Sequence, residues 1–446
     1  MKKLILSVLL IPAVFSAQQT VSRDAEIANY VSQVSADSLK SHINKLVSFG
    51  TRHTMSSTTD AKKGIGAARN WVLSKFKNYA KNSDGRMEVF LQSQTIQPDG
   101  KRINQPTDLG NAIAILRGTD PNDKRIFMIG GHLDSRVSDV MNAKDFAPGA
   151  NDDGSGVGAV IESARILSQS KFPATIVFVA FSGEEQGLLG AKMLAEKAKN
   201  ENWQLEALLN NDMVGNNLSS ETNLINANQL RVFSEGLPQF DLDKKAQGIR
   251  NLGLENDGEA RQLARYIKEI GERYVDNLEV KLIYRNDRFF RGGDHTSFVN
   301  QGFSAVRLTE FNENYDHQHQ DIRKENGKQF GDLPEFMDFE YFKKNVGVNV
   351  SVLANLAKSP SKPENVKMDV KELTNFTTIH WEKPKNGEVV GYYVLMRETD
   401  SSIWQKKFFT KENSMKLPYS KDNYFFAVQA VNSSGNESLI VIPSVK

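Results

Sequence analysis

The residues of this sequence most able to do chemistry are acids and histidines placed directly after apolar, strand-like runs. His132 and Asp134 follow the run RIFMI, and the pair Glu184 and Glu185 follows the run TIVFVAF. Asp212 follows a further strand-like segment. Paired acids at the end of an apolar strand are costly to bury unless they bind something. Carboxylate and imidazole groups in this arrangement are typical of a divalent metal site.

Asp152 lies in a glycine-rich turn, PGANDDGSG, which opens a predicted helix. Glycines allow a backbone to approach a cation closely, so Asp152 is a candidate ligand. Its neighbour Asp153 has a plainer interpretation as the N-cap of the helix, which would leave Asp152 free to bind metal. Asp134 stands close enough to His132 to accept the second ring N–H and fix the tautomer.

A last candidate ligand comes from Glu310 to Asp321, EFNENYDHQHQD, which contains His317 and His319. One of these histidines completes a set of His, Asp, Glu, Asp and His. Such ligands suit zinc, and four terminal ligands around one bridging carboxylate suit a pair of zinc ions. Cobalt or manganese are possible substitutes, because the ligand types do not exclude them.

The elements that must position these residues alternate between strand and helix. Apolar runs predict strands at 111–116, 125–129, 175–181, 205–211 and 303–308. Helical periodicity predicts helices at 25–34, 38–47, 62–76, 156–168, 188–199, 259–275 and 341–357. The nearly all-apolar run at 175–181 is typical of a central parallel strand. The alternation predicts an α/β sandwich with a mainly parallel sheet, whose ligands lie at the carboxyl ends of strands.

The pattern changes at the Pro/Ser-rich segment 358–364, which we interpret as a linker. After it, short alternating strands at 377–381, 392–397 and 424–430 are separated by turns. This pattern predicts an all-β sandwich domain over residues 365–446. The simplest role for its aromatic residues Trp381 and Tyr424 is core packing.

Bulk properties narrow the class of protein. The first 17 residues read as a signal peptide, with Lys2 and Lys3 before an apolar run and small residues at the end. We therefore expect export to the periplasm or the extracellular space, and no later segment is apolar and long enough to span a membrane. The net charge of +2 gives no case for a nucleic-acid partner. The absence of cysteine excludes thiol chemistry and Cys-ligated zinc.

At these motifs the chain resembles the M28 family of metallopeptidases, the co-catalytic zinc aminopeptidases, over roughly residues 37–356. The resemblance implies a three-layer α/β sandwich with a mixed sheet, of the zinc-exopeptidase type, over residues 18–357. It implies that His132, Asp152 and Asp212 hold one zinc ion. Asp152, Glu185 and the late histidine would hold the other. Asp134 would be the partner of His132, and Glu184 the general acid and base.

The late histidine departs from the common family pattern, Tyr-His-Thr-x-x-Asp. Counting back from Asp321 selects His317, whereas relatives that end in Gln-His-Gln-Asp select His319. We favour His319 and keep His317 as the alternative. Asp294 and His295 resemble a further family segment that lines the site. For His295, an equally good interpretation is a structural histidine at the start of a helix, with its hydrogen bonds made within the fold.

The resemblance implies an exported di-zinc aminopeptidase acting on peptides with a free N-terminus, in which Glu184 takes a proton from a metal-bridging water. Alternatives of the same fold are a glutaminyl cyclase and a carboxypeptidase. We rank the cyclase lower because such enzymes tend to lack the stretch NDDGSG seen at 151–156. A non-catalytic, receptor-like protein is an alternative from a different functional class. The presence of every ligand type, together with Glu184 as an additional acid, argues against it.

The C-terminal domain resembles a fibronectin type III module, which implies binding to protein or polysaccharide, or spacing. Residues 231–288 have no motif that we can decode, and we interpret them as an insertion that shapes the substrate pocket.

Overall fold

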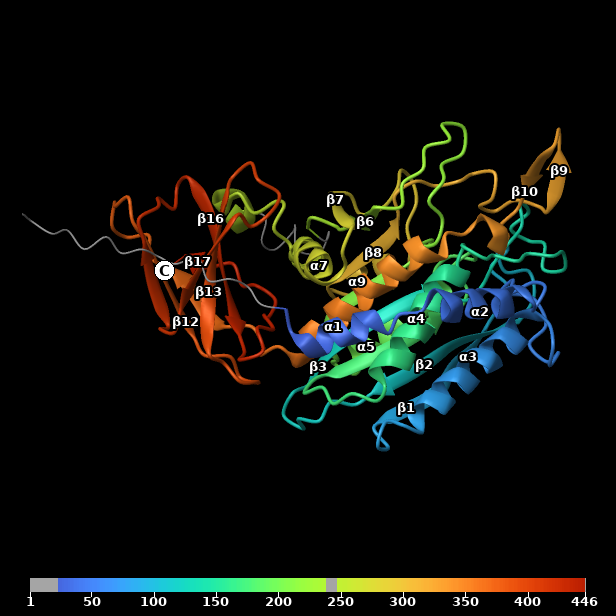
Figure 1. Ribbon diagram of the computed structural model, residues 1–446, viewed down its shortest axis with the longest axis horizontal. Helices are drawn as coiled ribbons and strands as arrows, with labels where there is room; N and C mark the ends of the chain where they lie inside the picture. The colour runs from blue at the N-terminus through green and yellow to red at the C-terminus, as the bar shows by residue number, and fades with distance from the viewer. Residues whose placement is uncertain (1–22, 238–246, 446) are drawn as a thin grey trace, which may run out of the picture.

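The computed structural model describes residues 23–237 and 247–445 of the chain. The predicted signal peptide lies outside the described residues. Figure 1 shows an α/β unit joined to a smaller all-β unit, coloured orange to red, at one end of the molecule. None of the described helices combines the length and the apolar character needed to cross a membrane.

An eight-stranded mixed sheet forms the centre of the α/β unit. Its spatial order is β1-β2-β4-β3-β5-β8-β6-β7. Neighbouring strands β4, β3, β5 and β8 are parallel, and the remaining pairs are antiparallel except β6 and β7. The bounds are β1 Met87–Ile96, β2 Thr107–Leu116, β3 Arg125–His132, β4 Thr175–Phe181, β5 Gln204–Asn211, β6 Gln229–Phe233, β7 Glu279–Ile283 and β8 Ala305–Glu310.

Helices cover both faces of this sheet and make three layers (Figure 1). One face carries α1 Ala25–Ser32, α2 Ala36–Val47, α3 Gly64–Ala80, α4 Gly154–Leu167, α7 Glu259–Tyr274 and α9 Phe339–Lys358. The other face carries α5 Leu189–Asn200 and α8 Asp294–Asn300. Strand β4 is buried throughout and apolar after Thr175, because alternate residues serve the two cores: Phe178 faces the first core and Val179 the second. The predicted fold class is confirmed.

Part of the segment 231–288 belongs to the scaffold of the α/β unit. The segment is therefore more than the pocket-shaping insertion expected from the sequence. Strand β7 pairs with β6 at the edge of the sheet, and α7 packs its apolar face into the first core. The segment from Tyr284 to Gly293 is a loop that leads back to α8. A small hairpin of β9 Arg323–Glu325 and β10 Lys328–Phe330, followed by the short helix η1 Pro334–Phe336, precedes α9.

The all-β unit is a sandwich of a four-stranded and a three-stranded sheet. Trp381 and Tyr392 meet edge to face in its core, with ring centroids 5.4 Å apart. The strands are β11 Glu364–Met368, β12 Thr377–Glu382, β13 Gly391–Glu398, β14 Lys406–Thr410, β15 Ser414–Leu417, β16 Tyr424–Val431 and β17 Ser444–Val445. The domain boundaries drawn from the sequence stay predictions.

The segment that leads from α9 into the sandwich adjoins the amino ends of the parallel strands. Arg125, the first residue of β3, donates to the main-chain oxygens of Ser359 and Pro360 at 2.8 and 3.0 Å. The carboxyl ends of the parallel strands therefore lie at the end of the sheet that faces away from this segment.

Candidate metal centre

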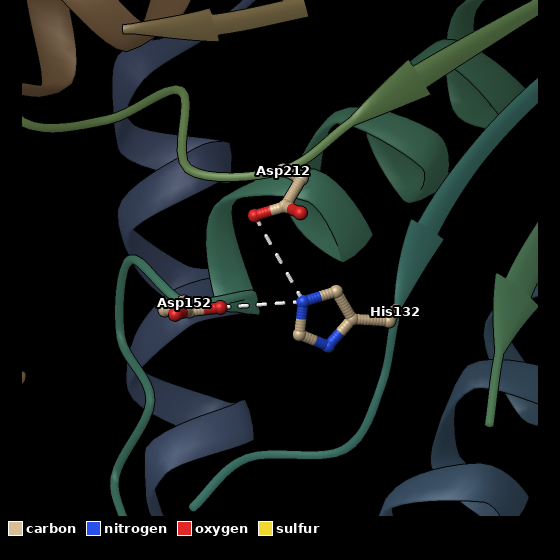
Figure 2. Close-up of side chains that lie close together, drawn as sticks. All are labelled: His132, Asp152 and Asp212. Atoms are coloured by element: carbon tan, nitrogen blue, oxygen red, sulfur yellow. Dashed lines mark ion pairs between the residues drawn. The ribbon is translucent and has the colours of Figure 1, made fainter. Parts of the chain in front are cut away.

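The carboxyl ends of the parallel strands bring the predicted ligands together in two overlapping groups. The His132 group contains His132, Asp152 and Asp212, and the His319 group contains Asp152, Glu185 and His319. Within each group, the candidate ligand atoms all lie within 4.8 Å of one another. Figure 2 shows the carboxylates of Asp152 and Asp212 directed toward the imidazole of His132.

Asp152 is shared between the groups through different oxygens. Its Oδ1 atom lies 3.2 Å from Nε2 of His132, and its Oδ2 atom lies 3.0 Å from Nε2 of His319. Nε2 of His319 also lies 2.8 Å from Oε1 of Glu185. Burial would lower the pKa of His319, but Glu185 and Asp152 raise it to about 10. Three carboxylates and two imidazoles, mostly buried and in mutual reach, form a donor set that fits a pair of zinc ions.

Nε2 of His132 faces the other ligands because its second ring nitrogen is engaged. Nδ1 lies 3.0 Å from the main-chain oxygen of Asp134 and 3.8 Å from the carboxylate of that residue. A carbonyl oxygen can only accept, so Nδ1 carries a proton, and the neutral form of the ring has its lone pair on Nε2. The contact joins the two residues expected from the sequence, but through the main chain of Asp134 rather than its carboxylate.

The carboxylate of Asp134 instead holds the turn after β4. It accepts the N–H groups of Gly183, Glu184 and Glu185 at 2.8, 3.1 and 3.0 Å, and the hydroxyl of Thr54 at 3.0 Å. The turn fixes the direction of both glutamates. The sequence offered no motif for Thr54, which reaches the site from the loop after α2.

Asp153 is the N-cap of α4 and accepts the Gly156 N–H at 2.8 Å. It also accepts the N–H of His132 at 2.9 Å, which ties the helix start to the end of β3. Asp152, the preceding residue, is left to point at the two histidines. The local roles of the acid pair agree with the assignment made from the glycine-rich turn.

Two residues that sequence reasoning missed hold the loop before Asp152 in place. The carboxylate of Asp332 accepts the N–H of Asp152 at 2.7 Å. The guanidinium of Arg52, which is fully buried, donates to the main-chain oxygens of Pro148 and Gly149 at 2.6 and 2.8 Å. Both are far from Asp152 in sequence and belong to no motif, so only the tertiary structure connects them with the site.

Glu184 lies beside the centre and is half-buried. Burial raises its pKa well above the usual value, and the neighbouring acids Glu185 and Asp212 add to that effect. Glu184 belongs to neither ligand group. It is therefore an acid beside the two groups that is not itself a candidate ligand.

Asp294 and His295 stand at the start of α8. Burial raises the pKa of Asp294 to about 8, and neither carboxylate oxygen has a hydrogen-bond partner among the described residues. Nε2 of His295 lies 2.8 Å from the main-chain oxygen of Asn286, so this histidine anchors the loop from Tyr284 to Gly293. Neither residue joins a ligand group within the described part of the chain.

His317 joins neither ligand group within the described part of the chain. Its ring stacks on Phe336, with centroids 3.7 Å apart and an interplanar angle of 12°. Burial lowers the pKa of His317 to about 4. The structure thus brings His319, the favoured late histidine, to the carboxylates and places His317 in an aromatic contact.

Comparisons with known proteins identify a family for each of the two domains. The sequence model of peptidase family M28 matches residues 111–333, and the model of the fibronectin type III domain matches residues 361–443. The chain is 42% identical over 421 residues to a probable zinc metalloprotease of Leptosphaeria maculans, covering 94% of this chain and 97% of the relative. It is 41% identical over 424 residues to a probable zinc metalloprotease of Pyrenophora teres f. teres, covering 94% and 87%.

Solved structures show the same fold at low sequence identity. The LapA aminopeptidase of Legionella pneumophila superposes with a TM-score of 0.53 at 19% identity, covering 76% of each chain. A leucine aminopeptidase precursor from Bacteroides thetaiotaomicron superposes with a TM-score of 0.51 at 16% identity, covering 72% of this chain and 98% of that one. The sequence relatives and the family model together confirm the resemblance: the chain belongs to peptidase family M28, is a zinc metallopeptidase, and carries a C-terminal fibronectin type III domain.

Proposed function

We propose that this metallopeptidase is an exported aminopeptidase that uses two zinc ions and Glu184 to remove N-terminal residues from peptides. The observation that supports it best is the position of Asp152, whose two carboxylate oxygens face different histidines. A carboxylate placed in this way suits a bridge between two ions. The solved structures named as aminopeptidases share the fold, which makes this activity the first to test.

Each ligand group would hold one ion, with Asp152 common to both. Bound zinc would lower the pKa of a water ligand and would polarise the carbonyl oxygen of the peptide. The protein supplies orientation: Asp134 sets the tautomer of His132 through its main-chain oxygen, and Asp332 and Arg52 fix the loop that carries Asp152.

Glu184 moves the proton in this proposal. Its N–H is held by Asp134, and it precedes the candidate ligand Glu185 in the chain without belonging to either ligand group, so its carboxylate would be free to act as a base there. It accepts a proton from the water during attack on the scissile carbonyl. It then returns that proton to the amine that leaves.

A substrate panel tests the activity. The purified protein is assayed on aminoacyl-anilides, on peptides with a blocked N-terminus and on a peptide with N-terminal glutamine, with chelator and with added zinc. We expect hydrolysis of the free aminoacyl substrates only, its loss with chelator and its return with zinc. Release of C-terminal residues, or pyroglutamate formation without hydrolysis, would contradict an aminopeptidase and favour the carboxypeptidase or cyclase alternative.

The role of Glu184 is tested by Glu184→Gln. This change keeps the size of the side chain but removes the proton acceptor, so we expect kcat to fall by about a hundredfold or more. Zinc content, measured by atomic emission, is expected to match the parent because Glu184 is not a ligand. Glu196→Gln, an exposed position on α5, serves as the control and keeps full activity. A Glu184→Gln variant that hydrolyses aminoacyl-anilides at the parent rate would overturn the assignment.

Export is tested separately by expressing the full chain in a bacterial host and sequencing the N-terminus of the protein recovered outside the cytoplasm. We expect the mature chain to begin at Gln18. A protein that stays inside the cells with Met1 in place would contradict the proposal of export without affecting that of activity.

A further inference from the structure

Asp212 shares one carboxylate oxygen between the candidate metal centre and a buried arginine. Its Oδ1 atom lies 4.0 Å from Nε2 of His132 and 3.0 Å from Nη2 of Arg307. Arg307 lies in the middle of β8, and its side chain is fully buried. The oxygen that faces the histidine of the His132 group is therefore already paired with a positive charge.

Glu185, the carboxylate that belongs only to the His319 group, has different surroundings. Its Oε1 atom faces His319 at 2.8 Å, whereas Nη1 of Arg136 lies 4.0 Å from the other oxygen, Oε2. Arg136 is also partly exposed to solvent, and its Nε and Nη2 atoms donate to main-chain oxygens. Gln318 donates to Oδ2 of Asp152 at 3.0 Å, but its amide is neutral. Among the described residues, a close arginine contact with a candidate ligand is thus confined to the His132 group.

We propose that Arg307 is a positioning residue that weakens the hold of the His132 group on a divalent cation. A guanidinium paired with a ligand oxygen in a buried site repels an ion at that oxygen and competes for its lone pairs. We expect the His319 group to bind Zn²⁺ more tightly than the His132 group, by about tenfold or more. The inference rests on the proposed function in that both groups bind zinc.

Arg307 cannot simply be removed, because it also neutralises Asp287. Nη1 of Arg307 lies 3.0 and 3.1 Å from the two carboxylate oxygens of Asp287, whose side chain is 1% exposed. A buried carboxylate that loses its partner strongly destabilises a fold. The double variant Arg307→Met/Asp287→Asn removes one charge of each sign and leaves the net charge of the protein unchanged. Arg288, another partner of Asp287, keeps its contact with Glu313 at 2.8 Å.

The test is a titration of the metal-free full chain with Zn²⁺ against a chromophoric chelator, repeated with Co²⁺ to follow its d–d absorption. The parent is expected to show a tight and a weak site. His132→Ala should remove the weak site, and His319→Ala the tight one. Arg307→Met/Asp287→Asn should tighten the weak site by about tenfold or more and leave the tight site unchanged. The matched control Arg136→Met should change either affinity by less than about threefold.

Equal affinities in the parent, loss of the tight site in His132→Ala, or an unchanged weak site in Arg307→Met/Asp287→Asn would each overturn the inference. These results are distinct from failure of the proposed function. A parent that hydrolyses aminoacyl-anilides with two equal zinc sites refutes the role of Arg307 alone. A parent with a tight and a weak site but no hydrolysis refutes the aminopeptidase and leaves the role of Arg307 standing.

Discussion

At the candidate metal centre, each ligand side chain is oriented by a hydrogen bond made at an atom that does not face the metal. His132 offers Nε2 to the carboxylates because Nδ1 donates to the main-chain oxygen of Asp134. Asp152 is held through its main-chain N–H by Asp332, and its two carboxylate oxygens face different histidines. A hydrogen bond at an atom that does not bind the metal orients the ligand in advance, so less conformational entropy is lost when the metal binds.

The pair His317 and His319 provides a sharp test at this scale. We expect His319→Ala to lose one equivalent of zinc and most activity, because Nε2 of His319 faces Asp152 and Glu185. His317→Ala should keep both equivalents and lose only the stacking on Phe336, about 1 kcal/mol of stability. Zinc content and thermal unfolding of the two variants measure these effects. Loss of zinc in His317→Ala with full zinc in His319→Ala would reverse the assignment.

At the scale of elements, α4 is held against α2 by one buried carboxylate. Glu162 of α4 accepts from the N–H of Ser35 at 3.1 Å and from the hydroxyl of Ser38 at 2.8 Å, at the start of α2. Arg165, one turn later in α4, donates to both of its oxygens at 2.7 and 2.9 Å. Helix α4 begins at the Asp152 turn, so this contact also supports the metal centre from behind.

This contact predicts a pH dependence of stability. Burial would raise the pKa of Glu162, but Arg165, His42 and Ser38 lower it from 4.5 to about 2. A group whose pKa is lower in the folded state stabilises the fold above its unfolded pKa, and that contribution is lost as the pH falls through the folded pKa. We expect Glu162→Gln to lose up to about 3 kcal/mol at pH 6, with the difference from the parent shrinking below about pH 4.5.

Urea unfolding at a series of pH values measures this difference. Glu340→Gln, at an exposed position of α9, is the matched control and should follow the parent curve. A gap between Glu162→Gln and the parent that stays constant down to pH 3 would show that ionisation of Glu162 is not the source of the stability.

The elements that the sequence predicted well are those with an unambiguous period. Strand β4 matched at both ends because every residue of it is buried. Strand β1 was missed because it is an edge strand in which most side chains are partly or fully exposed, so its apolar signal is diluted. The site followed the same rule: the sequence pointed to the candidate ligands that lie in glycine- and acid-rich turns and that the structure brings together. Arg52, Asp332 and Arg307 carry no local pattern and act only through tertiary contacts.

At the scale of the whole molecule, the fibronectin type III domain is joined to the peptidase domain by a buried polar interface. Glu437 of the sandwich has a fully buried side chain, and Arg273 of α7 pairs with both of its oxygens at 2.8 Å. Its main-chain oxygen accepts the hydroxyl of Tyr266 at 2.7 Å. These contacts lie away from the carboxyl ends of the parallel strands, so the sandwich supports the scaffold from the edge of the sheet opposite the metal centre.

An interface of this kind makes the two domains unfold together. Removing Glu437 takes away one of the two carboxylate partners of Arg273, because Glu269 also lies 2.8 Å from that guanidinium. The loss of stability is therefore smaller than the about 3–5 kcal/mol that a buried charge costs when it loses its only partner. We therefore expect Glu437→Ala to lower the midpoint of a single calorimetric transition of the full chain, while zinc content and kcat of the folded protein stay at the parent values. Glu412→Ala, at an exposed turn of the same domain, should leave the transition in place. Separate transitions, of which only the smaller one shifts in Glu437→Ala, would mean that the sandwich is an independent module tethered by the segment 358–364 rather than part of the peptidase scaffold.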